Sequence, residues 1–217
     1  MNSASGKSRV FALSLATLAW FGVLLQCYLS LRTAAQNGKS VGGGLQSFFS
    51  YFTVLTNLLI SVSLTFSLSA PASTPGKWFP RPGVVAGIAT SIGFVALSYH
   101  FLLRHVWNPQ GAQWLADVLL HYLIPALYVF YWWLDFSKAA LRWMHPLFWS
   151  AYPIVYLVYA LIRGGIGGSY PYPFIDVAAL GYGRTMINSL GLLVVFIALG
   201  LLFVALSRAR RRASITQ

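Results

Sequence analysis

The sequence contains very few acidic residues and a single cysteine. Glutamate is absent, and the only acidic side chains among 217 residues are Asp117, Asp135 and Asp176. Charged residues make up 8% of the chain, whereas an average soluble domain has about 25%. A chain this poor in charge could not cover its own surface in water. This excludes a soluble single-domain enzyme, a disordered chain and a coiled coil. The lone Cys27 can form no intrachain disulfide.

Hydrophobic residues are abundant instead, at 58% of the chain. A helix needs about 20 mostly apolar residues to cross a bilayer. Six segments satisfy this requirement, at about 9–31, 47–70, 83–104, 113–134, 145–163 and 184–207. We therefore predict an all-α integral membrane protein, a single domain over residues 1–217 built as a bundle of six transmembrane helices. The first segment is too long for a signal-peptide core, so we expect an uncleaved anchor.

The basic residues indicate how the helices are oriented. The net charge of +12 can indicate nucleic-acid binding, but these residues lie between apolar runs, so we expect a lipid surface and no nucleic acid. If the N-terminus is cytoplasmic, the positive-inside rule favours an arrangement with both termini inside. The inside then holds Lys7, Arg9, Lys77, Arg81, Lys138, Arg142, Arg208, Arg210, Arg211 and Arg212. The outside holds Arg32, Lys39, Arg104, Arg163 and Arg184.

Polar residues within membrane spans are costly, so their positions are informative. Four predicted helices carry a polar pair at i and i+4, which places both side chains on one face. The pairs are Thr53–Asn57, His100–Arg104, Asp117–His121 and Arg184–Asn188. Because successive helices alternate in direction, all four pairs fall in the same half of the membrane. The sequence predicts one polar cavity, open on the side that bears the odd-numbered loops.

His121 lies in the middle of the fourth predicted helix, where a neutral imidazole needs a partner. Asp117, one turn earlier, can hold one ring nitrogen and leave the other as a base, the orienting role of the acid in a hydrolase triad. Pro125 lacks an N–H, so we expect it to free the carbonyl of His121 and to bend the helix. The alternative is a hydrogen bond that only holds the bundle together.

Thr53 and Asn57 are candidates for the other parts of a hydrolase site. A Thr hydroxyl acts as a nucleophile when a base lies within hydrogen-bond reach, and His121 has a matching depth on another helix. The amide of Asn57 could stabilise an oxyanion. The alternative for Thr53 is a hydrogen bond to a carbonyl of its own helix.

A further group of residues is predicted to bind substrate, namely His100, Arg104, Asp176, Arg184 and Asn188. Arginines near the interface can hold a carboxylate or phosphate headgroup, although they can also extend to the surface. Asp176 follows a segment, 169–175, whose closely spaced prolines prevent a regular helix. We expect this segment to form a lid or plug at the outer interface. Asp176 itself could instead pair with an arginine.

Three short elements together resemble one family of membrane proteins. The segment Phe52–Leu58, the His121-to-Pro125 spacing and Tyr172-Pro173-Phe174 resemble, in order and spacing, the androgen-induced gene 1 and androgen-dependent TFPI-regulating protein family. Its members are six-pass threonine hydrolases of fatty-acid esters of hydroxy fatty acids. The resemblance implies that Thr53 is the nucleophile and His121 the base. It also implies that the chain is a bacterial relative of the family, located in the bacterial plasma (inner) membrane. The chain departs from the animal proteins of the family at two places. Thr56–Asn57 occur near the position where those proteins have an Asp, and Asp117 occurs near the position where they have an Asn.

The interpretation that we favour is a lipid-ester hydrolase that needs no cofactor and no metal and acts on a membrane lipid or fatty-acid ester. In it, Asp117 orients His121, which activates Thr53. One alternative is a metal-dependent hydrolase, whose ligands would be His100, His105, His121 and Asp117. A second alternative is a lipid-binding or transport protein that uses the same cavity.

Overall fold

A computed structural model describes residues 6–106, 108–137 and 139–215 of the chain, and these residues contain helices and turns but no β-strand. Within this part, six helical segments are long and apolar enough to cross a membrane, at Ser8–Gln36, Phe52–Ser69, Pro82–Leu103, Ala112–Asp135, His145–Gly167 and Val177–Ser214. The predicted helical class and the number of apolar spans are thus confirmed. Lys138, assigned above to the inner side, lies outside the described residues.

The spans are bounded differently from the prediction at several points. Helix α1 (Gly6–Gln36) extends beyond the predicted apolar run, and a separate short helix, α2 (Val41–Phe48), lies between the first two spans. Helix α3 therefore begins only at Phe52 and runs to Ser69. The loop before the third span contains helix α4 (Thr74–Trp78). Hydropathy detects the apolar core of a span, but it misses helix that continues into the interface.

The second half of the chain contains two breaks that hydropathy also misses. The fifth span consists of α8 (His145–Trp149) and α9 (Ala151–Gly167). The last helix, α10, runs from Val177 to Ile215, with a kink at Gly181, where φ is 71°. A positive φ suits glycine because it has no Cβ. Between α9 and α10 lies a segment that we call the strap, residues 168–176, which contains one short 3-10 turn, η3 (Pro173–Ile175).

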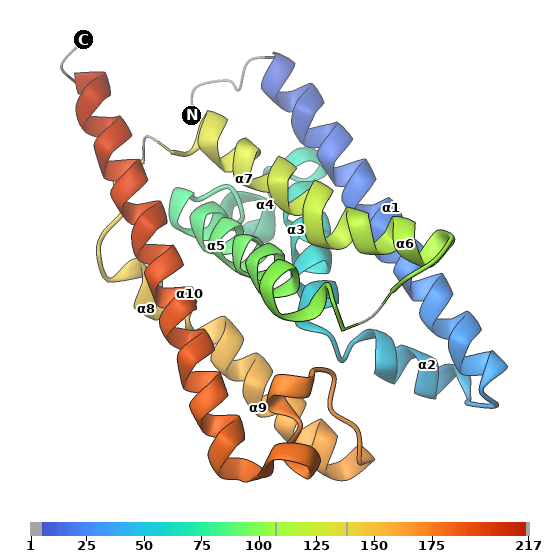
Figure 1. The fold of residues 1–217 in the computed structure, drawn as a ribbon. Coiled ribbons are helices and arrows are strands. Elements are labelled where there is room, and N and C mark those ends of the chain that lie inside the picture. The colour runs from blue at the N-terminus through green and yellow to red at the C-terminus, as the bar shows by residue number, and fades with distance from the viewer. Residues whose placement is uncertain (1–5, 107, 138, 216–217) are drawn as a thin grey trace.

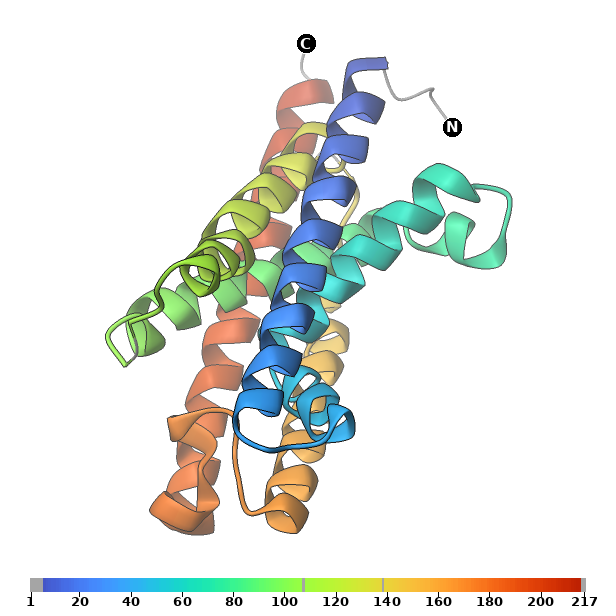
Figure 2. The ribbon, with the colours of Figure 1, turned by 90° about the vertical axis from the view of Figure 1, so that its right-hand side faces the viewer.

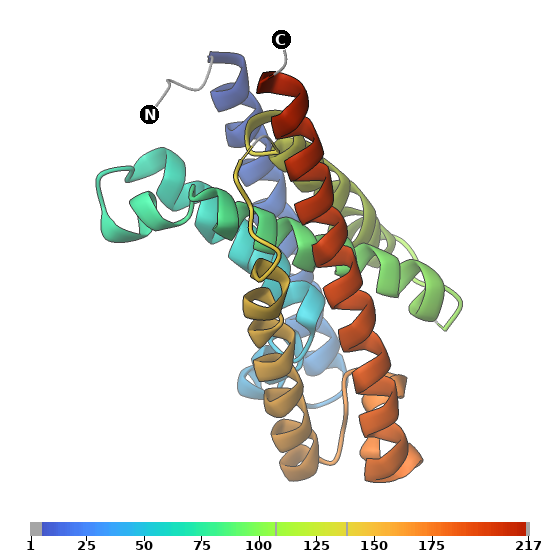
Figure 3. The same ribbon diagram turned by 90° about the vertical axis from the view of Figure 1, so that its left-hand side faces the viewer.

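Both described ends of the chain lie at the same end of the bundle, as an even number of passes requires (Figure 1). The opposite end carries α2, the end of α9 and the strap, and the two side views agree (Figures 2 and 3). Helices α3 and α5 (Pro82–Ser98) and the fourth span pack in the centre, where Trp132, Tyr128 and Ile92 are fully buried. At Gly87 of α5, an added Cβ would lie 2.7 Å from Trp149 Cδ1, so this close packing requires glycine.

Two π-helical turns interrupt the third and fourth spans. The first, η1 (Tyr99–Leu103), follows α5, and the second, η2 (Leu119–Leu123), joins α6 (Ala112–Val118) to α7 (Ile124–Asp135). Pro125 is the second residue of α7. Single π-helical turns occur frequently at functional sites because they change the direction in which side chains point. The sequence-predicted residues His100 and His121 lie within these two turns.

Candidate functional site

A polar cavity of about 450 Å³ lies at the end of the bundle opposite the termini, as the sequence predicts. Its walls come from α1, α2, the start of α3, the two π-helical turns, α6 and the strap. Three of the predicted catalytic residues, Thr53, Asp117 and His121, line this one cavity. The chain therefore brings together side chains that are far apart in the sequence.

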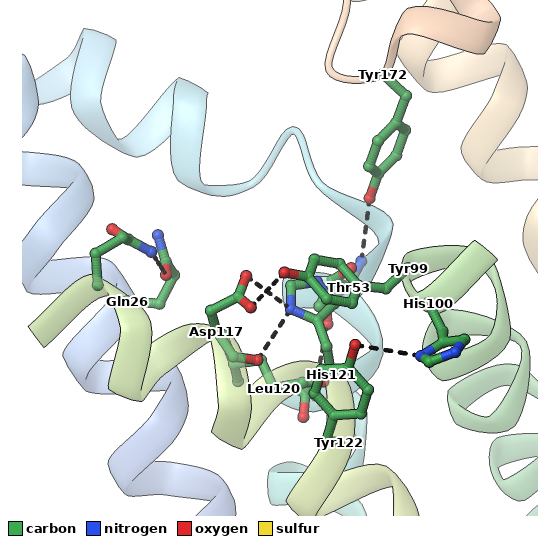
Figure 4. A network of polar contacts seen from close by, with 11 residues as sticks. Gln26, Thr53, Tyr99, His100, Asp117, Leu120, His121, Tyr122 and Tyr172 are labelled. Carbon is green, nitrogen blue, oxygen red and sulfur yellow. Dashed lines mark hydrogen bonds and ion pairs between the residues drawn. The ribbon is translucent and has the colours of Figure 1, made fainter. Parts of the chain in front are cut away.

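Asp117 and His121 are held against Tyr99 (Figure 4). His121 Nδ1 lies 3.3 Å from Asp117 Oδ1 and 3.1 Å from the Asp117 carbonyl oxygen. The Tyr99 hydroxyl donates to Asp117 Oδ2, and its ring stacks on the imidazole with centroids 3.9 Å apart. Asp117 is buried and His121 is partly exposed to the cavity. The carboxylate and the stack together fix the orientation of the imidazole, while Nε2 makes no hydrogen bond with the described residues.

Asn57 is fully buried and joins α3 to the fourth span. Its Nδ2 donates to the Thr53 carbonyl at 2.8 Å and to the Leu120 carbonyl at 3.1 Å. An amide nitrogen has two hydrogens, and both are used here. Asn57 is therefore not free to donate to an oxyanion in this arrangement. Its observed position instead fixes Thr53 relative to the helix that carries His121.

The Leu120 carbonyl is available to Asn57 because of the π-helical turn. In this turn the Ile124 N–H donates to the Leu119 carbonyl, five residues earlier. Continued by one residue, the same pattern would pair Leu120 with the N–H of residue 125, which proline lacks. At the α-helical spacing of four, the carbonyl freed by Pro125 is that of His121, as predicted above. The extra residue in the turn moves it to Leu120.

We expect Asn57→Ala to lower the free energy of unfolding of the protein. The change would leave the buried Leu120 carbonyl without its partner, and an unsatisfied buried polar group costs about 1–3 kcal/mol. Thermal unfolding in detergent would measure the loss. Thr17→Ala, which removes an exposed hydroxyl bonded within α1, is the matched control. Equal melting temperatures for Asn57→Ala and the control would show that Asn57 does not clamp the helices.

Thr53 lies in the first turn of α3 and is 7% exposed. The first N–H groups of any α-helix have no intrahelical acceptor. At the start of α3, the N-cap residue Tyr51 supplies no side-chain acceptor for them. The Thr53 N–H instead points to the Tyr172 hydroxyl, 3.5 Å away (Figure 4). No hydrogen bond between Thr53 and His121 is found in the described structure, although both side chains line the polar cavity.

Tyr172 reaches Thr53 from the strap. Burial raises the pKa of the Tyr172 phenol, and hydrogen bonds from Thr53 oppose this only in part, so the hydroxyl stays protonated at neutral pH. The ring stacks on Phe174 at 5.1 Å between centroids. Asn188 of α10 donates to the Phe174 carbonyl at 3.1 Å and holds the strap in place. The segment predicted to be a lid is thus packed directly over the candidate nucleophile.

The other predicted binding residues lie outside the polar cavity. Arg104 donates from Nε to His105 Nε2 at 2.8 Å and contacts His100 Nε2 through Nη1 at 3.0 Å, on the exposed end of η1. Arg184 is exposed on α10. Asp176 does not pair with an arginine in the described structure but caps α10, accepting from the N–H groups of Ala178 and Ala179 at 3.0 and 3.2 Å. The structure gives these residues roles at the surface or at a helix end.

The ligands of the metal-dependent alternative do not converge. Among the described residues, no three His, Cys, Asp or Glu side chains lie close enough together to hold one ion. His100 and His105 are both engaged by the Arg104 guanidinium. A fixed positive charge between two candidate ligands opposes the binding of a cation, so this alternative has no geometric support.

Several residues of the cavity wall, among them Gln26, Tyr99, Lys39 and Tyr172, are not among the predicted site residues, although the sequence carries signals for some of them. Gln26 of α1 accepts from Gln113 Nε2 at 2.9 Å and donates to Ser30 Oγ at 3.3 Å, and a Gln within an apolar span is itself a polar signal. A buried Tyr hydroxyl needs a partner, which applies to Tyr99. Lys39 and Tyr172 lie in connecting segments, where sequence spacing does not indicate contacts.

No protein-family model, curated protein or solved structure matches the chain. The site must therefore be interpreted from its own geometry.

Proposed function

We propose that this protein is an integral membrane lipid-ester hydrolase in which Thr53 is the nucleophile and His121 is the base. The observation that carries the proposal is the polar cavity that Thr53 shares with the oriented Tyr99–Asp117–His121 group. A hydroxyl, an imidazole with one free nitrogen and a buried carboxylate are the components of an acyl-transfer site. The resemblance to the androgen-induced gene 1 family agrees with these roles.

The reaction proceeds in two steps. His121 Nε2 takes the Thr53 hydroxyl proton, directly or through one cavity water, while Oγ1 attacks the ester carbonyl carbon. The tetrahedral intermediate collapses, the bond to the alcohol oxygen breaks, and the alcohol leaves with the proton held by His121. Water then attacks the threonyl ester and gives a proton to His121. That proton returns to Thr53 Oγ1 as the carboxylic acid is released.

The oxyanion is stabilised at the start of α3. The Thr53 N–H has no intrahelical acceptor, and the helix dipole favours negative charge at this end. The Tyr172 hydroxyl lies beside this N–H group, 3.5 Å from the Thr53 nitrogen. It can rotate to donate to a substrate oxygen. These two donors take the role that the sequence interpretation gave to Asn57, whose hydrogens bind backbone carbonyls. Asn57 becomes a positioning residue.

The substrate is an ester drawn from the lipid bilayer, and the reaction requires no cofactor and no nucleic acid. We further propose that the chain lies in a bacterial plasma membrane with both termini in the cytoplasm, following the excess of basic residues at that end. The polar cavity then opens toward the outer face. Among the described residues of the cavity wall, Asp117 carries the one carboxylate and Lys39 the one ammonium group.

Covalent labelling tests the proposal. A lipid-like fluorophosphonate should label the purified wild-type protein, and mass spectrometry of the digest should place the adduct on Thr53. Prior incubation with a long-chain ester should slow the labelling, because both compounds use one nucleophile. Protein unfolded by heat is the control for nonspecific reaction. An adduct on another hydroxyl, or labelling that persists after heating, would contradict the assignment.

A further inference from the structure

A second cavity adjoins the polar one and has the opposite chemical character. It measures about 160 Å³ and lies between α5, α9 and α10, with the strap at one end. Its wall is almost entirely aliphatic and aromatic, including Phe94, Val95, Leu157, Leu193 and Phe196. An apolar wall inside an apolar bundle leaves no distinct pattern in the sequence, so this cavity could not be predicted.

The two cavities meet at the proposed nucleophile. Thr53, Tyr99, Leu103 and Tyr172 line both of them. The Thr53 side chain and the Tyr172 hydroxyl therefore stand at the boundary between a polar chamber and an apolar slot. An ester whose carbonyl carbon lies at Thr53 therefore has one of its two substituents in each cavity.

Part of the wall of the apolar slot lies at the surface of the bundle. Three of its lining residues are exposed there, Ile154 of α9 at 43%, and Met186 and Leu190 of α10 at 37% and 61%. The spans that contain α9 and α10 are also the least buried of the six. Exposed apolar faces of this length are covered by lipid in a membrane-spanning protein. The slot thus opens sideways, toward acyl chains.

From this arrangement we infer that the slot holds the acyl chain of the substrate, which reaches Thr53 from the bilayer between α9 and α10. The inference rests on the proposed hydrolase function. It adds that the acyl part of the ester, and not the alcohol part, is the hydrocarbon chain that comes from the bilayer. The carbons next to the carbonyl lie in the slot, whose volume of about 160 Å³ accommodates only a short part of a long acyl chain, and the rest of the chain extends into the bilayer. The alcohol leaves into the polar chamber, where Gln26, Gln113 and Lys39 can bind a polar alcohol.

The lining itself supports this assignment of the two arms. Water needed for the second step reaches the threonyl ester from the polar side, where His121 lies. The polar atoms around the slot are confined to a few hydroxyl groups, among them those of Ser98 and Ser189. A charged or strongly hydrated group would lose its solvation there without compensation. The reverse placement, with the polar alcohol in the slot, is disfavoured for that reason.

Substitutions at the mouth of the slot test the inference. Ile154→Trp and Leu190→Trp add bulk where the slot meets lipid, and the full-length protein would be assayed in lipid nanodiscs. The substrates are p-nitrophenyl acetate and p-nitrophenyl palmitate, which share a leaving group and differ only in the acyl chain. We expect kcat/KM for the palmitate to fall about 10-fold or more, and that for the acetate to change by less than about 2-fold.

Val155→Trp and Ile187→Trp are the matched controls. Both residues are exposed on the same helices, at 67% and 66%, and neither lines the slot. Unchanged hydrolysis of the palmitate by both mouth variants, or an equal loss for both esters, would overturn the inference while leaving the hydrolase proposal intact. Failure of the wild-type protein to hydrolyse either ester would instead refute the proposed function, and with it the inference.

Discussion

Thr53→Ala is expected to reduce ester hydrolysis by a factor of about 10³ or more and to abolish fluorophosphonate labelling. The change removes the attacking oxygen and leaves the cavity wall otherwise in place. Thr53 Oγ1 has no structural hydrogen bond to a helix carbonyl among the bonds found in the described structure, unlike Thr56, whose hydroxyl donates to the Phe52 carbonyl at 2.7 Å. The cost to folding should therefore be small compared with the cost to catalysis.

Two further variants make the result specific. Thr53→Ser keeps a hydroxyl at the same position and should retain labelling at a reduced rate. Thr56→Ala removes a buried hydroxyl one turn along the same helix, which also lies 3.2 Å from the Tyr152 hydroxyl, and should retain labelling. Steady-state hydrolysis and melting temperature would be measured for all three. Labelling of a folded Thr53→Ala protein at the wild-type rate would refute a threonine nucleophile.

The six-span architecture could be predicted because it depends on composition. Each span needs a long apolar run, and the 18-residue apolar window that defines each span holds at most two charged residues. The polar cavity could also be predicted from alternation, since Thr53 and His121 each lie within the first half of an apolar helix that starts at the same end of the bundle. The partner of His121 followed from a spacing of four on one helix. These inferences required only periodicity and chain direction.

What could not be predicted depends on tertiary contacts. The π-helical turn at 119–123 shifts the freed carbonyl from His121 to Leu120, and no local pattern distinguishes it from an α-helical turn. The same limitation applies to Asn57, whose partner lies 63 residues away. Tyr172 reaches Thr53 from a loop, across 119 residues. The cap that Asp176 forms on α10 could not be predicted either, because α10 begins at Val177 and the predicted span begins at 184.

Asp117→Asn is expected to lower kcat by about 10²–10⁴-fold with little change in KM. The carboxylate accepts from the Tyr99 hydroxyl and faces His121 Nδ1. This contact keeps the proton on Nδ1 and leaves Nε2 free to accept the Thr53 proton. An amide in its place carries no charge, and its N–H competes for Nδ1 with the Asp117 carbonyl oxygen, which lies 3.1 Å from that nitrogen. Where the amide donates, the ring proton moves to Nε2 and the base is lost. The carboxylate also stabilises the imidazolium that forms during attack.

Tyr99→Phe is the matched comparison for this variant, because it preserves the stacked ring on His121 and removes only the hydroxyl that donates to Asp117. We expect a loss of about 10-fold, since a single hydrogen bond to a charged group contributes about 1.5–3 kcal/mol and the carboxylate itself remains. Rates of fluorophosphonate labelling would follow the same order, wild type, then Tyr99→Phe, then Asp117→Asn. If folded Asp117→Asn protein hydrolysed esters within a few-fold of wild type, the Asp117–His121 contact would be only a helix-stabilising pair. The base would then have to be sought elsewhere on the cavity wall.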